Sequence, residues 1–509
     1  MTKTGKVTLV GAGPGDPGLI TVRGLEAIKD ADVIIYDYLA NPALLKHAKE
    51  KAEKIYVGKK GGAHTLRQDG INQLLYDKAA SASHVVRLKG GDPYIFGRGS
   101  EEMSFLVQRG VEVEVVPGIP AALGAAAYAG IPLTDRRHTS TLAFVTGHED
   151  PSKDDSSIDW SKISTAAGTL VFYMGVKNLT DIVSKLVGNG RSPQTPVSIV
   201  EWATMPKQRV VTGTLGDICA KAVSENVKPP ALTIVGEANE LRGELAWFEK
   251  KPLFGKTIVV TRTRAQASKL DEALRRLGAD TIEMPTIAIV PPDDWGPMDA
   301  AAGELGSYHW AIFTSVNGVE YFMERLWKIG GDARNFANVR VASIGPATSQ
   351  RLRDFGIVPD FQPDKYVAEE VFEGLCGIEP PDGKKYLMPR ADIAREALPR
   401  LLREQGAKVN EVVAYKTVPG DFDVVELRAR IADGGVDAVT FTSSSTARFF
   451  AERIGADFIA ANAKKFAGIS IGPVTSDTMR KCGIPLSAEA EDYTIPGLVA
   501  AALKFFGVK

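Results

Sequence analysis

A glycine-rich segment near the start of the chain could hold a nucleotide or another small ligand. Gly11, Gly13 and Gly15 follow an apolar run typical of a strand, and Asp37 follows the next such run. In a dinucleotide-binding fold, such glycines approach a pyrophosphate, and an acidic residue about 20 positions later binds the ribose. Asp16 stands where that motif needs its third glycine, and its charge would repel a pyrophosphate. The segment alone fits a ligand loop or a tight turn, and an NAD-dependent oxidoreductase is the weaker alternative.

A second loop, RLKGGDPYIFGRGSEE, begins at Arg87 and is longer and more specific. Its glycines would let a ligand approach the backbone at the end of a strand. Asp92 could accept a hydrogen bond from a ligand amine or hydroxyl, and Lys89 and Arg98 could pair with carboxylates. The alternative is a helix start with ordinary capping.

Hydroxyl-rich loops occur twice in the second half of the chain. FTSVNG begins at Phe313 and FTSSST at Phe441, while IGPATS begins at Ile344 and IGPVTS at Ile471. Such loops at helix N-termini offer N–H and O–H donors to anions, although serine and threonine also simply cap helices. The candidate binding residues are Thr314, Ser315, Thr348, Ser443 and Thr475.

An α/β framework is expected to position these loops. Strand-like apolar runs alternate with helical patterns along the whole chain, which is typical of α/β proteins. In the first half we expect strands at Val7–Gly11, Val33–Tyr36, Val85–Leu88, Leu142–Thr146, Leu170–Met174 and Leu232–Val235. The charged segment EKKPLFGK at 249–256 contains proline and glycine and precedes a new strand, so it predicts the main domain boundary.

The second half contains an internal duplication. The FTS segments start 128 residues apart and the IGP segments 127 apart, and a segment at Thr261 matches one at Pro389, again 128 apart. Three matches in one order and at one offset predict two copies of an α/β unit. Two lobes of this kind imply a cleft that binds a ligand. Extending the alignment places Ile287 opposite Tyr415, so Tyr415 breaks the symmetry between the copies.

Composition excludes several classes of function. The chain has 509 residues, 44% of them hydrophobic and 24% charged, and a formal net charge of −1. No overall field favours nucleic acid or an anionic membrane. The three cysteines and six histidines lack ligand spacing, so we expect no disulfide framework and no metal site. With no signal-peptide pattern and no apolar stretch long enough to span a bilayer, we expect a cytoplasmic protein.

Residues 6–248 resemble uroporphyrinogen-III C-methyltransferases. The motifs that carry the resemblance are VGAGPGDPGLIT, RLKGGDPYIFGRGSEE, VPGIPAA, YMG and ALTIVG. The resemblance implies a homodimeric domain of residues 1–248 with two α/β subdomains, about 1–117 and 118–248. It also implies S-adenosyl-L-methionine as the methyl donor, released as S-adenosyl-L-homocysteine. By motif position the donor would be bound by Pro14, Gly90, Gly91, Asp92, Ile95, Pro120, Ala121, Met174 and Ala203.

Two of these positions depart from the family pattern. Pro120 replaces a usual threonine and Ala203 a common glycine; backbone atoms can make both contacts. The proton acceptor and donor suggested for the family map to Asp37 and Lys59. Two methylations of uroporphyrinogen III, at C2 and C7, would give precorrin-2, with its further fate (sirohaem, cobalamin or another product) left open. The substrate is rich in carboxylates, and its binding would use basic residues, chiefly Lys89, Arg98 and Arg136.

The rest of the chain, from about residue 255, resembles uroporphyrinogen-III synthases. YVAEEVFEGL from Tyr366 and AYKTV from Ala414 add to the duplicated motifs. The resemblance implies cyclisation of hydroxymethylbilane to uroporphyrinogen III, with loss of water and inversion of ring D, and a role for Tyr415 in hydroxyl departure. After a linker at 249–256, the synthase domain would span 257–509, with lobe A at about 257–288 plus 416–509 and lobe B at about 290–414. The alternative for this half is a tetrapyrrole-binding sensor without synthase activity.

Overall fold

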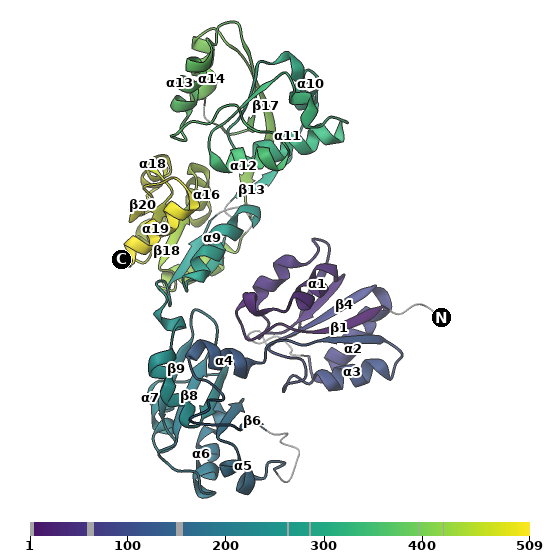
Figure 1. Cartoon of the computed structure of the whole chain (residues 1–509), viewed down its shortest axis with the longest axis vertical. Helices are drawn as coiled ribbons and strands as arrows, with labels where there is room; N and C mark the ends of the chain where they lie inside the picture. The colour runs from purple at the N-terminus through teal and green to yellow at the C-terminus, as the bar shows by residue number, and fades with distance from the viewer. Residues whose placement is uncertain are drawn as a thin grey trace. The chain divides into compact units, whose positions relative to one another are not determined.

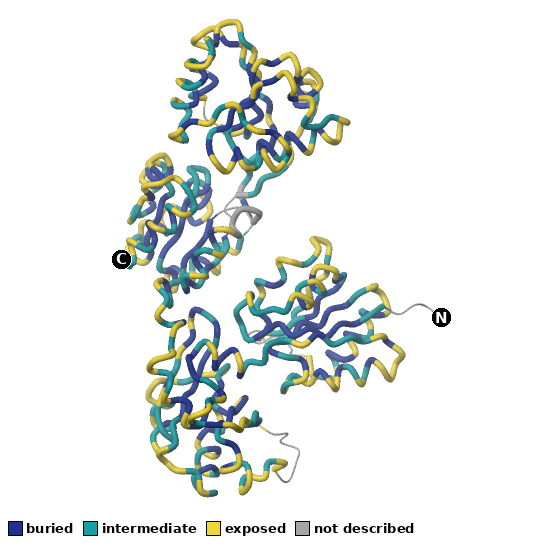
Figure 2. Tube along the Cα trace, viewed as in Figure 1, coloured by how far each residue is buried: buried dark blue, intermediate teal, exposed yellow. Residues whose placement is uncertain are grey.

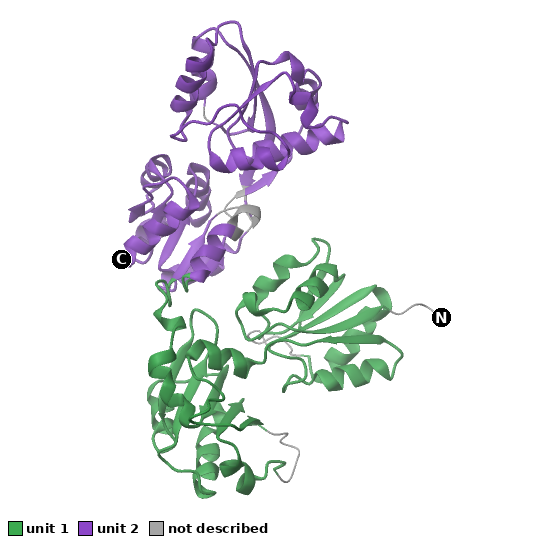
Figure 3. Cartoon of the chain, in the orientation of Figure 1, with its two compact units in different colours: residues 1–256, 277–280 green, residues 257–276, 281–509 purple. Residues whose placement is uncertain are grey.

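The computed structural model describes residues 5–58, 66–148, 156–261, 264–284, 287–394, 396–420 and 422–508. These form two compact units (Figure 3), residues 1–256 with 277–280 and residues 257–276 with 281–509. Both units are α/β, as expected from the sequence. Within the described residues, no helix is both long and apolar enough to cross a membrane.

The first subdomain of unit 1 is a parallel sheet with helices on both faces (Figure 1). Its strand order is β3-β2-β4-β1-β5. Helices α2 and α3 cover one face and α1 with η2 the other, so the strands are apolar on both faces. The elements are β1 (Lys6–Gly11), η1 (Pro17–Leu19), α1 (Val22–Asp30), β2 (Val33–Tyr36), η2 (Pro42–His47), β3 (Glu53–Tyr56), α2 (Gln68–Ser81), β4 (His84–Lys89), α3 (Gly99–Val107) and β5 (Glu112–Val116).

The second subdomain has a mixed sheet of order β6-β7-β10-β8-β9, in which β6 and β7 are parallel and the other pairs antiparallel. Its elements are α4 (Ala121–Ala129), β6 (Leu142–Thr146), α5 (Trp160–Ala166), β7 (Thr169–Tyr173), η3 (Val176–Asn178), α6 (Leu179–Gly188), β8 (Pro196–Glu201), β9 (Arg209–Thr214), α7 (Ile218–Ser224), β10 (Ala231–Val235), η4 (Glu237–Leu241), α8 (Arg242–Leu245) and η5 (Phe248–Lys250). The six strands expected in unit 1 are confirmed within one residue at each end. In each subdomain of unit 1, the buried strands form the centre (Figure 2).

Unit 2 contains two further sheets, of order β12-β11-β18-β19-β20 and β13-β17-β16-β14-β15. The first sheet uses β11 (Thr257–Val260), α9 (Arg264–Arg276), β12 (Asp280–Glu283), α15 (Val424–Ala432), β18 (Ala438–Phe441), α16 (Ser444–Ile454), α17 (Ala456–Asn462), β19 (Ala467–Ser470), α18 (Pro473–Lys481), β20 (Ala488–Glu489) and α19 (Ile495–Phe505). The second uses β13 (Ile287–Val290), α10 (Gly296–Gly303), η6 (Leu305–Ser307), β14 (Trp310–Phe313), α11 (Val316–Lys328), η7 (Ala333–Phe336), β15 (Arg340–Ser343), α12 (Pro346–Asp354), α13 (Ala368–Ile378), β16 (Lys385–Ala391), α14 (Ala397–Glu404) and β17 (Lys408–Pro419).

The two sheets of unit 2 repeat one strand order, which confirms the duplication. β12-β11-β18-β19 in one sheet corresponds to β17-β16-β14-β15 in the other. The correspondence extends to a single bridge, because Ala342 pairs with Phe361 as Ile469 pairs with Ala488, 127 residues later in each case.

Strand β17 is longer than its counterpart β12 and carries the symmetry-breaking tyrosine. Its end pairs antiparallel with β13, from Lys416 opposite Val290 to Pro419. Along β16 the register shifts, so that Arg390 faces Val413 but Ala391 faces Tyr415. A bulge changes the alternation of side chains between faces, and Ala414 and Tyr415 are consequently both buried.

Candidate active sites in the two units

Three glycine-containing loops pack backbone to backbone in unit 1. Gly13 and Gly91 form an antiparallel bridge, with N–H to carbonyl distances of 3.2 and 2.7 Å. A Cβ atom on Gly11 would lie 2.5 Å from the Cα atom of Gly118. Only residues without side chains allow this approach. The loops after β1, β4 and β5 therefore meet at the carboxyl edge of the sheet, where open α/β sheets bind ligands.

Asp16 connects the glycine-rich loop to the second subdomain. Its backbone N–H donates to the hydroxyl of Thr204 at 2.8 Å, and its carboxylate accepts from the hydroxyl of Tyr128 at 2.7 Å. Burial, and secondarily the bond to Asp16, raises the pKa of Tyr128, so this phenol stays a donor. Pro14 lies against Gly124, where a Cβ atom would be 2.5 Å from the Pro14 ring. The loop thus binds protein groups in place of a pyrophosphate.

Strained backbone marks the contribution of the second subdomain. Met174, directly after β7, has φ of 56°, and Trp202 and Thr204 have φ of 47° and 69°. Left-handed conformations of such residues are unfavourable and cluster at functional sites. Ala203 itself is not among the residues with positive φ. An alanine therefore fits where the family commonly has glycine, and its carbonyl lies 3.1 Å from the Cβ position of Gly15.

Two of the residues expected to bind the methyl donor, Pro120 and Ala121, lie against Gly91. The Cβ position of Gly91 lies 3.5 Å from the backbone nitrogen of Ala121 and 3.9 Å from Pro120 Cα. Gly90 packs against Leu39. Ile95, Ala121 and Ala203 pack on one apolar cluster that also contains Tyr173, the residue before Met174.

Asp92 suits the positively charged methyl donor. Its Oδ1 atom accepts from the N–H of Tyr94 at 2.8 Å and its Oδ2 from the N–H of Gly118 at 3.0 Å. Each carboxylate oxygen keeps capacity for another hydrogen bond, so a ligand amine or hydroxyl can bind in addition. The residues present therefore fit S-adenosyl-L-methionine.

Asp37 follows β2 and is fixed by two contacts. Arg87 Nη2 donates to its Oδ2 atom at 2.9 Å, and the N–H of Leu39 donates to its Oδ1 at 3.1 Å. The other proposed proton-transfer residue, Lys59, lies outside the described residues.

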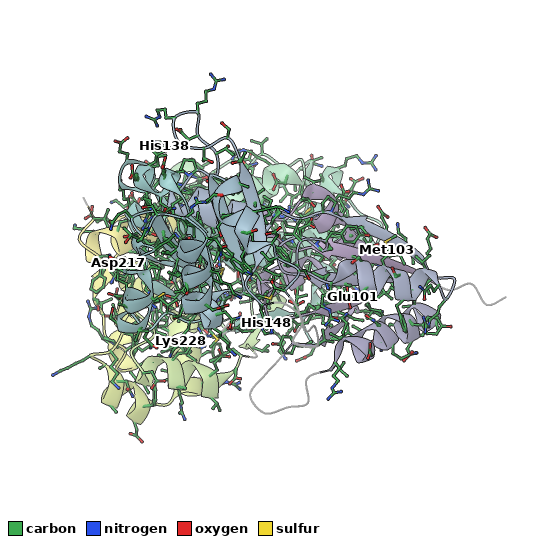
Figure 4. The ribbon with its side chains drawn as sticks, turned by 90° about the horizontal axis from the view of Figure 1, so that it is seen from below. Glu101, Met103, His138, His148, Asp217 and Lys228 are labelled. Atoms are coloured by element: carbon green, nitrogen blue, oxygen red, sulfur yellow. The ribbon has the colours of Figure 1, made fainter. Side chains whose placement is uncertain are left out.

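The three basic residues expected to bind substrate have different surroundings. Lys89 is 4% exposed and donates to Glu102 at 2.8 Å, so it lies in an internal ion pair. Arg98 is exposed and pairs with Glu101, whose hydrogen bond raises the pKa of Arg98. Arg136 is exposed in the turn before His138. Figure 4 labels Glu101 and Met103 on the first subdomain and His138, Asp217 and Lys228 on the second.

In unit 2, Tyr415 lies against the start of α11. Its hydroxyl is 3.1 Å from the hydroxyl of Ser315, which accepts the N–H of Gly318 at 3.0 Å as the helix cap. The ring of Tyr415 is 7% exposed. Burial raises the pKa of Tyr415, whereas hydrogen bonds to Ser315 and Asn317 lower it. The net effect keeps the phenol protonated and able to donate.

The other hydroxyl candidates occupy matching places in the two copies. Ser443 caps α16 as Ser315 caps α11, by accepting the N–H of Thr446 at 3.3 Å. Thr314 is partly exposed directly after β14. Thr348 and Thr475, in α12 and α18, are each 4% exposed. The serines thus stand at helix ends, and the two helical threonines lie inside the lobes.

Sequence reasoning missed a pair of tyrosines in unit 2. The ring of Tyr366 lies against Gly345, with 3.3 Å to its Cβ position, and the ring of Tyr493 lies against Gly472 at 2.8 Å. The two glycines are the N-caps of α12 and α18. Tyr366 and Tyr493 are 127 residues apart, so extending the comparison of the copies beyond the glycine loops would have found them.

Comparisons with known proteins match the two parts of the chain to two different families. Residues 6–219 match the family model described as "Tetrapyrrole (Corrin/Porphyrin) Methylases", and residues 268–500 match "Uroporphyrinogen-III synthase HemD". The "Porphyrin biosynthesis protein HemD" of Ruminiclostridium josui is 35% identical over 99% of this chain and 98% of its own length.

Two further relatives carry the name of a methyltransferase. The "Uroporphyrinogen-III C-methyltransferase" of Bacillus subtilis is 40% identical over 71% of this chain and 74% of its own length. The "S-adenosyl-L-methionine-dependent uroporphyrinogen III methyltransferase" of Methanosarcina barkeri is 49% identical over 47% of this chain and 93% of its own length. The chain therefore belongs to the family of porphyrin biosynthesis proteins in which a tetrapyrrole methylase is joined to a uroporphyrinogen-III synthase.

Proposed function

We propose that this chain is a bifunctional enzyme of tetrapyrrole synthesis. Unit 2 cyclises hydroxymethylbilane to uroporphyrinogen III, and unit 1 methylates that product twice, at C2 and C7, to give precorrin-2. The observation that carries the proposal for unit 1 is the convergence of Pro14, Gly91, Asp92, Ala121 and Ala203 from the two subdomains. The named activities of two relatives support the methylase half, and the match to the uroporphyrinogen-III synthase family model supports the other half.

The methylase reaction depends on positioning two reactants. S-adenosyl-L-methionine supplies an activated methyl group, and S-adenosyl-L-homocysteine is released. Asp92 and the backbone around Pro14, Gly90, Pro120 and Ala203 hold this donor, with Ile95 and Met174 beside it. Alignment of the reactants supplies much of the rate enhancement in such transfers.

Proton transfer completes the methylation. Asp37 accepts the proton that the methylated ring loses, because its carboxylate is fixed by Arg87 and partly exposed. Lys59 acts as the proton donor. Arg98 and Arg136, both exposed, bind substrate carboxylates.

In unit 2 the phenol of Tyr415 donates toward the departing hydroxyl of hydroxymethylbilane. Thr314, Ser315 and Ser443, all partly exposed, bind the chain of pyrrole rings through hydroxyls and N–H groups at strand and helix ends. The synthase domain spans residues 257–509, with its lobes at about 257–288 plus 416–509 and at about 290–414. We further propose a cytoplasmic homodimer, formed through the methylase half, that uses no metal and binds neither nucleic acid nor membrane.

Two separate assays test the two activities. Uroporphyrinogen III is incubated with S-adenosyl-L-methionine and the full chain, with Asp37→Asn as the inactive control. Hydroxymethylbilane is incubated with the full chain in the absence of S-adenosyl-L-methionine, with Tyr415→Phe as the control. Formation of precorrin-2 in the first assay and of isomer III in the second is expected. Formation of isomer I alone would contradict synthase activity in unit 2.

A further inference from the structure

The carboxylate of Glu102, on α3, is the centre of a buried charged cluster in unit 1. Its Oε1 atom accepts hydrogen bonds from Lys89 Nζ at 2.8 Å, Gln68 Nε2 at 3.1 Å and Arg87 Nε at 3.3 Å. The side chain of Glu102 is 0% exposed, and those of Lys89 and Arg87 are nearly as buried. Three donors therefore converge on one oxygen away from solvent.

The other carboxylate oxygen of Glu102, Oε2, receives none of these hydrogen bonds. Oε2 is buried and makes no hydrogen bond to any residue that the structure describes. A buried polar atom without a partner destabilises a fold, and removing the charges of Glu102, Lys89 and Arg87 from water adds a desolvation cost. Burial lowers the pKa of Lys89, and Arg87 lowers it further, whereas Glu102 opposes both effects. An arrangement that is poor for stability is expected where function requires it.

The cluster leads from Glu102 to Asp37 through one guanidinium group. Arg87 uses Nε toward Glu102 and Nη2 toward Asp37, the latter at 2.9 Å. Its Nη1 atom donates to the carbonyls of Leu88 at 3.0 Å and Ile35 at 3.4 Å. Because a guanidinium group is planar and its donors have fixed directions, the bond to Glu102, together with those to the two carbonyls, sets the direction of the bond to Asp37.

We propose that Glu102 is a positioning residue for the methylation step, which holds Arg87 so that Arg87 fixes the carboxylate of Asp37. The inference rests on the proposed role of Asp37 as proton acceptor. Without the charge of Glu102, no carboxylate stands between Arg87 and Lys89, so the two cations repel each other and the guanidinium shifts relative to Asp37. The donor-binding residues around Gly91 do not contact Glu102 through any hydrogen bond described here.

The test is Glu102→Gln in the full chain, with kcat and KM measured for uroporphyrinogen III and S-adenosyl-L-methionine. We expect kcat to fall about a hundredfold, the scale of a small misplacement of a reacting group. Both KM values and the Kd of S-adenosyl-L-homocysteine should change by less than about twofold, because ground-state binding is preserved. Glu112→Gln, an exposed glutamate on β5, is the matched control and should keep the wild-type kcat.

A double-mutant cycle separates the inference from the proposed function. Adding Glu102→Gln to Asp37→Asn should lower kcat no further than Asp37→Asn alone. If Asp37→Asn is inactive while Glu102→Gln keeps the wild-type kcat, the role of Glu102 is wrong and the proposed function stands. If Asp37→Asn keeps the wild-type kcat, the role of Asp37 fails and the role of Glu102 fails with it.

A second variant covers the case in which Glu102→Gln does not fold. Lys89→Met combined with Glu102→Gln removes one charge of each sign and so avoids leaving Lys89 as a buried cation without its carboxylate. Arg87 still lacks the carboxylate of Glu102 in this variant. The same loss of kcat is expected, and a wild-type kcat would overturn the inference.

Discussion

The hydroxyl of Tyr128 donates a 2.7 Å hydrogen bond to the carboxylate of Asp16 and thereby joins α4 of the second subdomain to the glycine-rich loop of the first. The ring of Tyr128 also packs against Trp247 and Phe248, with centroid distances of 5.1 and 4.7 Å. The ring is therefore held even without the hydroxyl, which makes this contact a clean target for substitution.

Tyr128→Phe should weaken both the fold of unit 1 and donor binding. A hydrogen bond to a charged group contributes about 1.5–3 kcal/mol, and we expect a loss at the lower end because Asp16 is partly exposed. The loop that carries Pro14 would also be held less firmly. Urea unfolding and calorimetric binding of S-adenosyl-L-homocysteine measure the two effects, with Tyr76→Phe on α2 as the control. Wild-type values for both quantities would contradict the role of this contact.

Gly124→Ala should impair donor binding by steric contact. The added Cβ atom would lie 2.5 Å from the ring of Pro14 and 3.0 Å from Thr204 Cγ2, and a proline ring cannot turn aside. We expect the Kd of S-adenosyl-L-homocysteine to rise at least about tenfold, equal to roughly 1.4 kcal/mol. Gly188→Ala, where no atom lies within 4 Å, is the control and should bind normally. Unchanged binding by Gly124→Ala would contradict this prediction, because it would show that the loop carrying Pro14 can move without weakening donor binding.

Tyr415→Phe should reduce synthase activity and leave methylation intact. The substitution removes the hydroxyl that lies 3.1 Å from Ser315 but keeps the ring beside Tyr321, 5.9 Å away. Loss of a proton-donating group lowers a rate by about 100-fold or more, so formation of uroporphyrinogen III should fall by that factor. Tyr308→Phe, with the same 7% exposure in the same sheet region, should retain activity. Equal rates for the two variants would remove Tyr415 from the mechanism.

Tyr386→Phe should be neutral or stabilising at pH 8 and clearly stabilising at pH 11. The Tyr386 hydroxyl is buried without a hydrogen-bond partner among the described residues, and burial raises the pKa of Tyr386 to about 12. The unfolded phenol ionises near pH 10, so stability present below pH 10 is lost as pH rises toward 12, by about 2–3 kcal/mol.

Urea midpoints at the two pH values, compared with those of the wild type, test this prediction. The difference between Tyr386→Phe and the wild type should grow with pH, because phenylalanine has no proton to release. A variant that is less stable than the wild type at pH 8 would reveal a favourable interaction of the hydroxyl.

Local sequence patterns predicted most of the framework. Apolar runs located the strands of unit 1, because strands of a sheet covered on both faces are apolar throughout. The recurring FTS and IGP segments predicted the two copies of unit 2, since each marks a strand followed by a helix. Glycines and Asp92 predicted where ligand loops would meet, since their conformational freedom and charge are properties of single residues.

Contacts between distant residues could not be predicted in the same way. Lys89 lies in a motif that predicts a ligand loop, yet its side chain is buried in an ion pair with Glu102 on α3. Asp16 and Thr204 are 188 residues apart and meet only in the folded unit. The bulge before Tyr415 depends on pairing with β16, and no local pattern encodes such a register shift.

The most direct test of the proposed bifunctional activity is the product that the full chain alone forms from hydroxymethylbilane and S-adenosyl-L-methionine. Mass spectrometry of the product, with separation of isomers, reads out both activities in one reaction. We expect a type III tetrapyrrole that carries two added methyl groups, with two molecules of S-adenosyl-L-homocysteine released for each. Unmethylated uroporphyrinogen, or uroporphyrinogen I as the only cyclic product, would contradict it.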